Sequence, residues 1–158
     1  MRCTEAAHWR GAWAALLLAV CMAPAAAGET AASAQATPPR YVRLDVPAAP
    51  RSATQLRLQL AQRLVAAHPD TTYLGPTPER LWAIPVLQVE LNADGSVRDI
   101  VVLRHPTTGD EATGLAIAAV KRAAPYGKLT HLRRPWRVIE TFLFDDDLRF
   151  KPRTLDAD

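Results

Sequence analysis

The stretch VLQVELNADGSVRDIVVLR, residues 86–104, constrains the fold more than any other part of the chain. Apolar and polar residues alternate from Leu87 to Asn92, which is the period that places one apolar row on one face of a β-strand. A second strand-like run, VRDIVVLR, follows shortly after Gly95. Asn92 and Asp94 favour turns because their side chains bond the nearby backbone, and Gly95 can adopt the positive φ of a tight turn. The stretch therefore predicts a β-hairpin with NADG at its turn.

A calcium-binding loop is the alternative interpretation of NADGS. A loop of the EF-hand type needs oxygen ligands at alternating positions and a bidentate glutamate at the twelfth position. Counted from Asn92, that position is Leu103, which has no ligand oxygen in its side chain. The pattern therefore excludes an EF-hand loop and favours the hairpin.

A helix is predicted before the hairpin. Ser52 is followed three residues later by Gln55, which makes a capping box, and leucines then recur at helical spacing. The helix is predicted to end at His68, which precedes a proline. The segment DTTYLGPTPER that follows is rich in turn-forming residues and predicts a loop.

A second helix is predicted after the hairpin. Thr108 and Glu111 make another capping box, and Lys121 and Arg122 place positive charge at the helix end. Pro125 ends the helix. Its predicted buried stripe consists of Leu115, Ala119, Val120 and Ala123.

A final strand is predicted over WRVIETFLF, residues 136–144. The element order becomes helix, strand, strand, helix, strand, and a right-handed helical crossover leaves room for the first strand between the other two. The predicted fold is α+β with two layers, in which helices pack on a three-stranded antiparallel sheet of order 2-1-3. The last two strands are apolar on both faces, so the first helix or the loops are expected to cover part of the second face.

The amino-terminal region has the three-part pattern of a secretory signal peptide. Basic residues precede the apolar run GAWAALLLAVCMA, and an A-x-A pattern that ends at Ala27 predicts cleavage after this residue. The run is shorter than the roughly 20 apolar residues of a membrane-spanning helix, so an uncleaved anchor or a lipoprotein is the less favoured alternative. Cys3 and Cys21 both precede the predicted cleavage point, which leaves no cysteine for a disulfide in the processed chain.

Four segments are predicted along the chain. Residues 1–27 form the signal peptide, and residues 28–50 form an Ala/Pro-rich arm whose lack of periodicity is typical of flexible segments. Residues 51–152 form the domain, and residues 153–158 form a disordered tail. The formal net charge of +3 is too small to indicate nucleic-acid binding.

Residue types that carry out chemistry occur without the neighbours that such chemistry needs. His68, His105 and His131 lie beside turn signals with no second ligand at metal-binding spacing, so they are predicted to be solvent-exposed loop residues. The acidic run 145–147 is predicted to end the last strand, because successive residues of an extended chain point to opposite sides and do not converge on a cation. No serine has an evident base, and no glycine cluster could cradle a phosphate. The sequence predicts no enzyme, no catalytic residue, no metal site and no cofactor.

A basic segment without acidic residues lies between Ala112 and Ile139. The predicted basic patch within it consists of Lys128, Arg133, Arg134 and Arg137. Two interpretations stay open. The patch contacts anionic lipid, an acidic polymer or an acidic partner protein, or it is a solvated surface that also compensates helix-end charge.

The hairpin pattern V-x-L-x-x-D-G-x-V-x-x-I, from Val89 to Ile100, precedes an alanine-rich helix, AIAAVKRAAP, and the ending LRFKP. Over residues 84–152 this order resembles the carboxy-terminal domain of the TonB/TolA family of envelope proteins. The resemblance implies a periplasmic protein-binding module of the Gram-negative envelope, whose sheet edge accepts an extended segment of a partner as an extra strand. The last strand is the predicted edge, and its predicted partner-binding residues are Trp136, Val138, Glu140 and Phe142.

Two alternatives stay open beside the binding module. One is a membrane-retained energy transducer for outer-membrane transport, although the spacer over residues 28–50 is short for such a role. The other is a small periplasmic enzyme with an unrecognised site. The expected partner is an envelope protein, and the same sheet edge could pair two copies of the chain into a homodimer.

Overall fold

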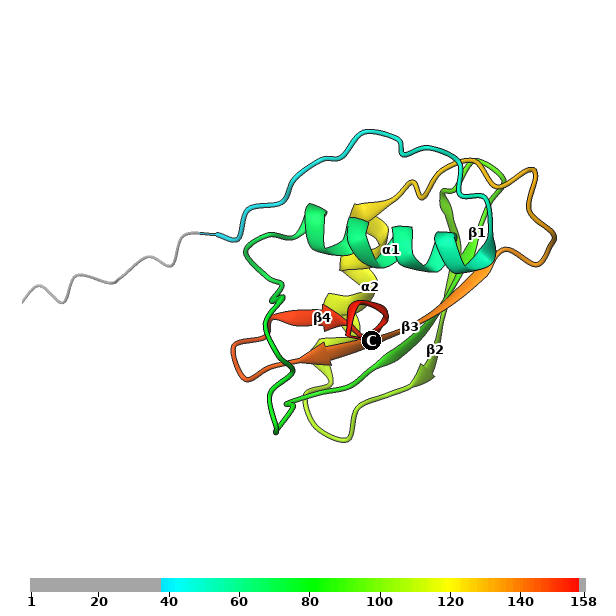
Figure 1. Ribbon diagram of the computed structural model, residues 1–158. Helices are drawn as coiled ribbons and strands as arrows, with labels where there is room; N and C mark the ends of the chain where they lie inside the picture. The colour runs from blue at the N-terminus through cyan, green and yellow to red at the C-terminus, as the bar shows by residue number, and fades with distance from the viewer. Residues whose placement is uncertain (1–37, 157–158) are drawn as a thin grey trace, which may run out of the picture. The chain divides into compact units, whose positions relative to one another are not determined.

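The structure is a computed structural model that describes residues 38–156. Two helices lie on one face of an antiparallel four-stranded sheet, which gives an α+β fold (Figure 1). The elements in chain order are α1 (Ala53–Ala67), β1 (Val86–Leu91), β2 (Val97–Arg104), α2 (Glu111–Ala123), β3 (Arg137–Phe144), β4 (Phe150–Pro152) and the 3₁₀ turn η1 (Arg153–Leu155). The predicted signal peptide and both cysteines lie outside the described residues. Within residues 38–156, neither helix has the length and hydropathy to cross a membrane.

The hairpin between β1 and β2 is confirmed. The Asn92 N–H donates to Ser96 O at 2.9 Å, and the Gly95 N–H donates to Asn92 O at 3.0 Å. Asp94 Oδ1 accepts the Ser96 N–H at 2.9 Å, and Gly95 has the positive φ of 84° that the turn requires. Local turn chemistry therefore fixes the register of the hairpin.

The sheet order is β2-β1-β3-β4, with all strand pairs antiparallel. The predicted order of the first three strands is confirmed, because Val89 of β1 lies opposite Ile100 of β2 on one side and Val138 of β3 on the other. The predicted count of three strands is wrong. The sequence run LRFKP supplies the fourth strand, which is too short for an alternating pattern to reveal.

β3 is an outer strand over residues 137–141 only, whereas the prediction placed the sheet edge along the whole strand. The chain turns at residues 145–149 and returns as β4, which pairs with the Phe142–Phe144 half of β3. Thr72 then forms a bridge with Phe150, so the outer side of β4 is paired as well. Among residues 38–156, β2 and β4 each have one strand neighbour, and β2 is the longer of these two outer strands.

The start of α1 is as predicted. The Ser52 side chain accepts the Gln55 N–H at 3.1 Å, and Gln55 Oε1 reaches back to the Arg51 N–H at 2.7 Å. The predicted capping box of α2 is wrong, because the Thr108 hydroxyl donates to Trp82 O at 2.7 Å instead of capping the helix. The Thr108 side chain, which the sequence pattern predicted to cap α2, therefore makes a tertiary hydrogen bond instead.

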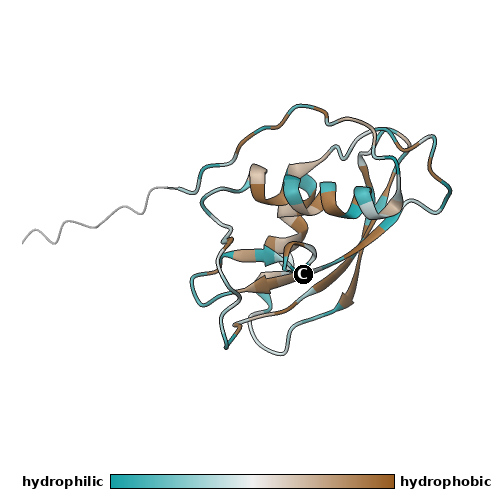
Figure 2. Cartoon of the chain, in the orientation of Figure 1, coloured by the Kyte–Doolittle hydropathy of each residue, from teal (hydrophilic) through white to brown (hydrophobic). Residues whose placement is uncertain are grey.

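The core lies between the helices and one face of the sheet. Leucines of α1, small residues of α2, Leu87 and Val89 of β1, and phenylalanines of β3 and β4 meet there. Figure 2 shows the strands largely in the hydrophobic colour, whereas polar and apolar residues alternate along α1. Burial of each large apolar side chain contributes about 1.5–3 kcal/mol, so this layer dominates the stability of the domain. Three members of the predicted α2 stripe are buried, but Leu115 is exposed.

The other face of the sheet is covered in part. Leu143 is buried there beneath the loop before β1, and the Tyr73 hydroxyl donates to Leu143 O at 3.1 Å. Val101, Leu103 and Ile139 remain exposed on β2 and β3. The expected loop cover therefore exists over the β3–β4 end of this face, but it does not extend to β2.

Residues 38–50 have no helix or strand but make specific contacts with the domain. The Val42 N–H donates to Ala67 O at 3.0 Å, and the Gln59 amide donates to Ala48 O at 3.1 Å. Arg63 donates to Asp45 O at 2.8 Å. These contacts differ from the expectation of a flexible arm over residues 28–50. The expected tail differs as well, because its first residues form η1.

Candidate protein-binding site

The outer edge of β2 is the first feature of the candidate site. β2 pairs with β1 on one side, and no strand of residues 38–156 pairs with it on the other. The Ile100 N–H donates to Asp99 Oδ1 at 2.8 Å. A carboxylate of the same strand thus holds a backbone donor that would otherwise be available to the carbonyl group of an added strand.

Two bulges bound the regular part of β2. Glu90 lies opposite Asp99 and Leu91 opposite Val97, so Arg98 is an extra residue in the β2 strand. Leu103 is extra in the same way between Val102 and Arg104. Bulges interrupt edge-to-edge pairing, so the segment that is regular enough to pair with another strand is residues 99–102.

A groove runs beside this segment, between β2 and α2. We define the β2/α2 groove by the apolar residues Val97, Ile100, Ile117 and Ala124, together with Arg98 and Lys121. Its volume is about 540 Å³. The four apolar side chains are partly buried and pack against the core on their inner side. The groove therefore presents a firm apolar floor directly beside an unpaired strand edge.

The groove is lined by two basic residues, Arg98 and Lys121, and by one acidic residue, Asp99. Arg98 is paired with Glu90, with Nη2 and Oε2 2.5 Å apart. Lys121 is exposed at the end of α2, and among the described residues it forms no ion pair with a carboxylate. An acidic side chain of a bound peptide could therefore pair with Lys121 without displacing a carboxylate already bound there.

The predicted partner-binding residues of β3 are mostly inaccessible. Val138, Glu140 and Phe142 are buried against the helices. Trp136 precedes β3, is partly buried, and donates from Nε1 to Leu132 O at 3.0 Å. The alternating pattern of β3 identified one face of the strand correctly, but this face forms the core and cannot contact a partner.

Glu140 has a structural role in this buried row. Its Oε1 accepts the backbone N–H groups of Thr141 and Thr154, each at 3.1 Å, and its Oε2 accepts the Thr154 hydroxyl at 2.6 Å. Burial raises the pKa of the Glu140 carboxyl, although these hydrogen bonds oppose the shift. Glu140 therefore connects β3 to η1 and occupies a backbone donor just beyond the part of β3 that β4 covers.

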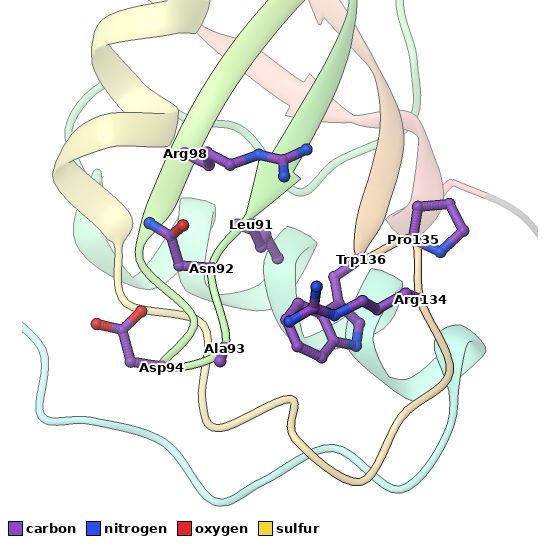
Figure 3. Close-up of a pocket in the computed structure, with 8 residues that line it drawn as sticks. All are labelled: Leu91, Asn92, Ala93, Asp94, Arg98, Arg134, Pro135 and Trp136. Carbon is purple, nitrogen blue, oxygen red and sulfur yellow. The ribbon is translucent and has the colours of Figure 1, made fainter.

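The residues of the predicted basic patch are all exposed, and none forms an ion pair with a carboxylate in the described part of the chain. The guanidinium carbon of Arg134 lies 4.5 Å from the centre of the Trp136 ring. Figure 3 shows both side chains beside the hairpin turn, where they line a pocket of about 530 Å³ that also includes Asp94 and Arg98. Lys128, Arg133 and Arg137 do not line this pocket.

The three histidines occupy different environments. His105 is exposed, and His131 lies at the surface with Nε2 bonded to Pro50 O. The prediction of an exposed loop is wrong for His68, which is 1% exposed. The His68 ring turns inward at the end of α1, and Nδ1 bonds Leu64 O at 2.8 Å. Across residues 38–156, no group of three or more potential ligand residues could hold a metal ion.

The acidic run after β3 builds a turn. Asp145 accepts the N–H groups of Asp147 and Arg149 and pairs with the Arg149 guanidinium. Asp147 also pairs with Arg149. These contacts use the carboxylates to direct the chain from β3 into β4.

Comparison with known proteins gives no identification: no protein-family model, no curated protein and no solved structure matches this chain. The resemblance to the TonB/TolA carboxy-terminal domain therefore rests on the sequence pattern alone.

Proposed function

We propose that this chain is an exported, periplasmic protein-binding module that accepts an extended segment of an envelope protein at the outer edge of β2. The proposal rests chiefly on one observation, the unpaired regular segment 99–102 beside the apolar β2/α2 groove. Backbone hydrogen bonds along a strand edge supply affinity, and pockets for alternate side chains supply selectivity. The signal-peptide pattern and the TonB/TolA resemblance support export and an envelope partner.

Binding would begin with release of the Asp99 cap. When the Asp99 carboxylate turns aside, the Ile100 N–H can donate to a carbonyl of the incoming segment. Side chains on one face of that segment would then enter the groove and contact Ile100 and Ile117. An acidic residue of the segment would pair with Lys121.

Site-specific crosslinking in intact cells tests the proposal. A photoreactive residue at Val101, which is exposed on β2, should capture an envelope protein, whereas one at the exposed Gln62 on α1 should not. Ile117→Arg should abolish capture at Val101, because it places a charge on the apolar floor of the groove without changing β2.

A different crosslinking result would favour another binding surface. Capture from Arg133 or Arg134 but not from Val101 would overturn strand addition at β2 and favour binding through the basic patch. The four exposed and unpaired basic side chains are the observation that keeps this second function under consideration. Circular dichroism of each variant would verify that the fold is retained.

A further inference from the structure

A second cavity lies on another side of α2 and shares no residue with the β2/α2 groove. We define it as the His68 pocket, whose apolar walls include Leu115, Ala119, Phe144, Leu148 and Phe150. Its volume is about 230 Å³, below the roughly 300–1,000 Å³ of sites for drug-sized ligands. A guest of this pocket must therefore be small, with about one ring system.

The rim of the pocket is unusually apolar for a surface. Tyr41, Leu115 and Leu148 all line the pocket and are all exposed. Leu148 also has a φ of 59°, a left-handed conformation that costs a branched side chain about 1–2 kcal/mol and that glycine or asparagine adopts more readily. The turn thus holds a large apolar side chain at the pocket rim despite a local cost.

His68, which lines the pocket, has an unpaired polar atom. Since Leu64 O can only accept a hydrogen bond, the proton of the neutral His68 ring lies on Nδ1, which leaves Nε2 as an acceptor. Burial lowers the pKa of His68 and so favours this neutral form. Nε2 is buried and has no hydrogen-bond partner within the described structure. An unsatisfied buried group costs about 1–3 kcal/mol, which a ligand with an N–H or O–H donor would relieve.

The mouth of the pocket carries a positive charge. The guanidinium carbon of Arg122 lies 3.7 Å from the centre of the Tyr41 ring, and its charge contributes to the lowered pKa of His68. No aspartate or glutamate lines the pocket in the described structure. A ligand with a carboxylate is therefore complementary to this opening.

We propose that the His68 pocket binds a small aromatic carboxylic acid that carries an N–H or O–H donor on its ring. The ring would lie against the apolar walls, the ring donor would bond His68 Nε2, and the carboxylate would bond Arg122. The Tyr41 ring meets His68 edge-on, with ring centres 5.6 Å apart, so it must shift to admit the ligand. This inference is independent of strand addition at β2.

Three matched compounds test the chemistry of the pocket. Indole-3-acetate has the ring, the N–H donor and the carboxylate, naphthalene-1-acetate lacks the donor, and indole-3-acetamide lacks the charge. In calorimetric titrations of the chain from Pro38 to Asp158, loss of either group should weaken binding about tenfold. Indole-3-acetate should also shift the amide NMR signals of Leu115 and Leu148 more than those of residues in the β2/α2 groove.

Two variants separate binding from folding. Leu148→Gly should stabilise the fold, because it relieves the left-handed leucine, yet it should weaken indole-3-acetate binding through loss of the rim. Ala118→Phe should fill the opening and abolish binding, whereas Gly114→Ala on the same helix should leave binding unchanged. Absence of binding at millimolar indole-3-acetate, equal binding of the three compounds, or full binding to Ala118→Phe would each overturn the proposal.

Discussion

At the scale of single residues, two buried ionisable side chains give the domain opposite responses to pH. Glu140 and His68 are both buried. Burial raises the pKa of the Glu140 carboxyl and lowers the pKa of the His68 imidazole, so it favours the neutral form of each group. The free-energy cost of burying the charged form grows with rising pH for a carboxyl group and with falling pH for an imidazole. Variants of the two residues should therefore differ from the wild type at opposite ends of the pH range.

Glu140→Gln should become more favourable relative to the wild type as pH rises. The folded-state pKa of Glu140 is raised, so its burial has no charge penalty below the unfolded value of about 4.3 and carries the full penalty above its folded pKa. Glutamine keeps an oxygen that can accept the Thr141 and Thr154 N–H groups. Urea unfolding of both proteins between about pH 4 and pH 8 measures the difference. A stability difference that does not change with pH would contradict the assigned shift.

His68→Phe should remove a loss of stability in mild acid. The folded-state pKa of His68 is lowered, so the native state is favoured fully above the unfolded value of about 6.5, and stability falls as the unfolded chain takes up a proton below it. Thermal unfolding from about pH 8 to pH 5 should show a steeper decline for the wild type than for the variant. Parallel declines would show that His68 does not contribute to the pH dependence.

At the scale of elements, glycine positions distinguish a required turn from a weak helix. Gly95 has a φ of 84°, and an added Cβ would lie 2.2 Å from Gly127 O, so Gly95→Ala should destabilise the domain by more than about 1–2 kcal/mol. Gly114 lies at an exposed position of α2, where an added Cβ would meet no atom within 4 Å, so Gly114→Ala should stabilise the domain by about 0.5–1 kcal/mol. Chemical denaturation of the two variants measures both effects, and equal effects would refute the structural distinction.

Elements with strong local chemistry could be predicted from the sequence. The NADG turn and the Ser52 cap are fixed by contacts within a few residues, so their patterns were sufficient. Elements that depend on distant contacts could not be predicted. Thr108 bonds Trp82 instead of capping α2, and β4 exists as a strand because Phe142–Phe144 lie beside it.

The sequence predicted the type of candidate site, a strand edge, but not its location. The sequence suggested a strand edge but placed it on β3, because nothing in the apolar pattern indicated that LRFKP would return to pair there. The apolar residues on both faces of β2 did not distinguish it from β3, which shows the same pattern. The groove could not be foreseen, since Ile100 and Ile117 come together only when α2 packs beside β2.

At the scale of the whole molecule, the segment before α1 is part of the folded unit. Removal of residues 38–50 from a chain that begins at Pro38 should lower the free energy of unfolding by about 1–3 kcal/mol, because hydrogen bonds of Arg63, Gln59 and Ala67 to this segment are lost. Thermal unfolding of the chains that begin at Pro38 and at Arg51 provides the comparison. Equal midpoints would show that these contacts add no stability.

In the proposed binding mode, a carboxylate already occupies a backbone donor at each strand edge that a partner could use, Asp99 on β2 and Glu140 on the part of β3 that β4 does not cover. Each carboxylate belongs to the same strand as the backbone N–H group that it occupies. It therefore competes with a partner for this N–H group as an intramolecular ligand, at a constant and high effective concentration. A partner strand that contributes only main-chain carbonyl groups replaces one hydrogen-bond acceptor, the carboxylate, with another. The net gain in binding free energy is therefore small. Complexes with unfolded polypeptides should therefore dissociate quickly. A long-lived complex should require a partner sequence whose side chains supply additional binding free energy.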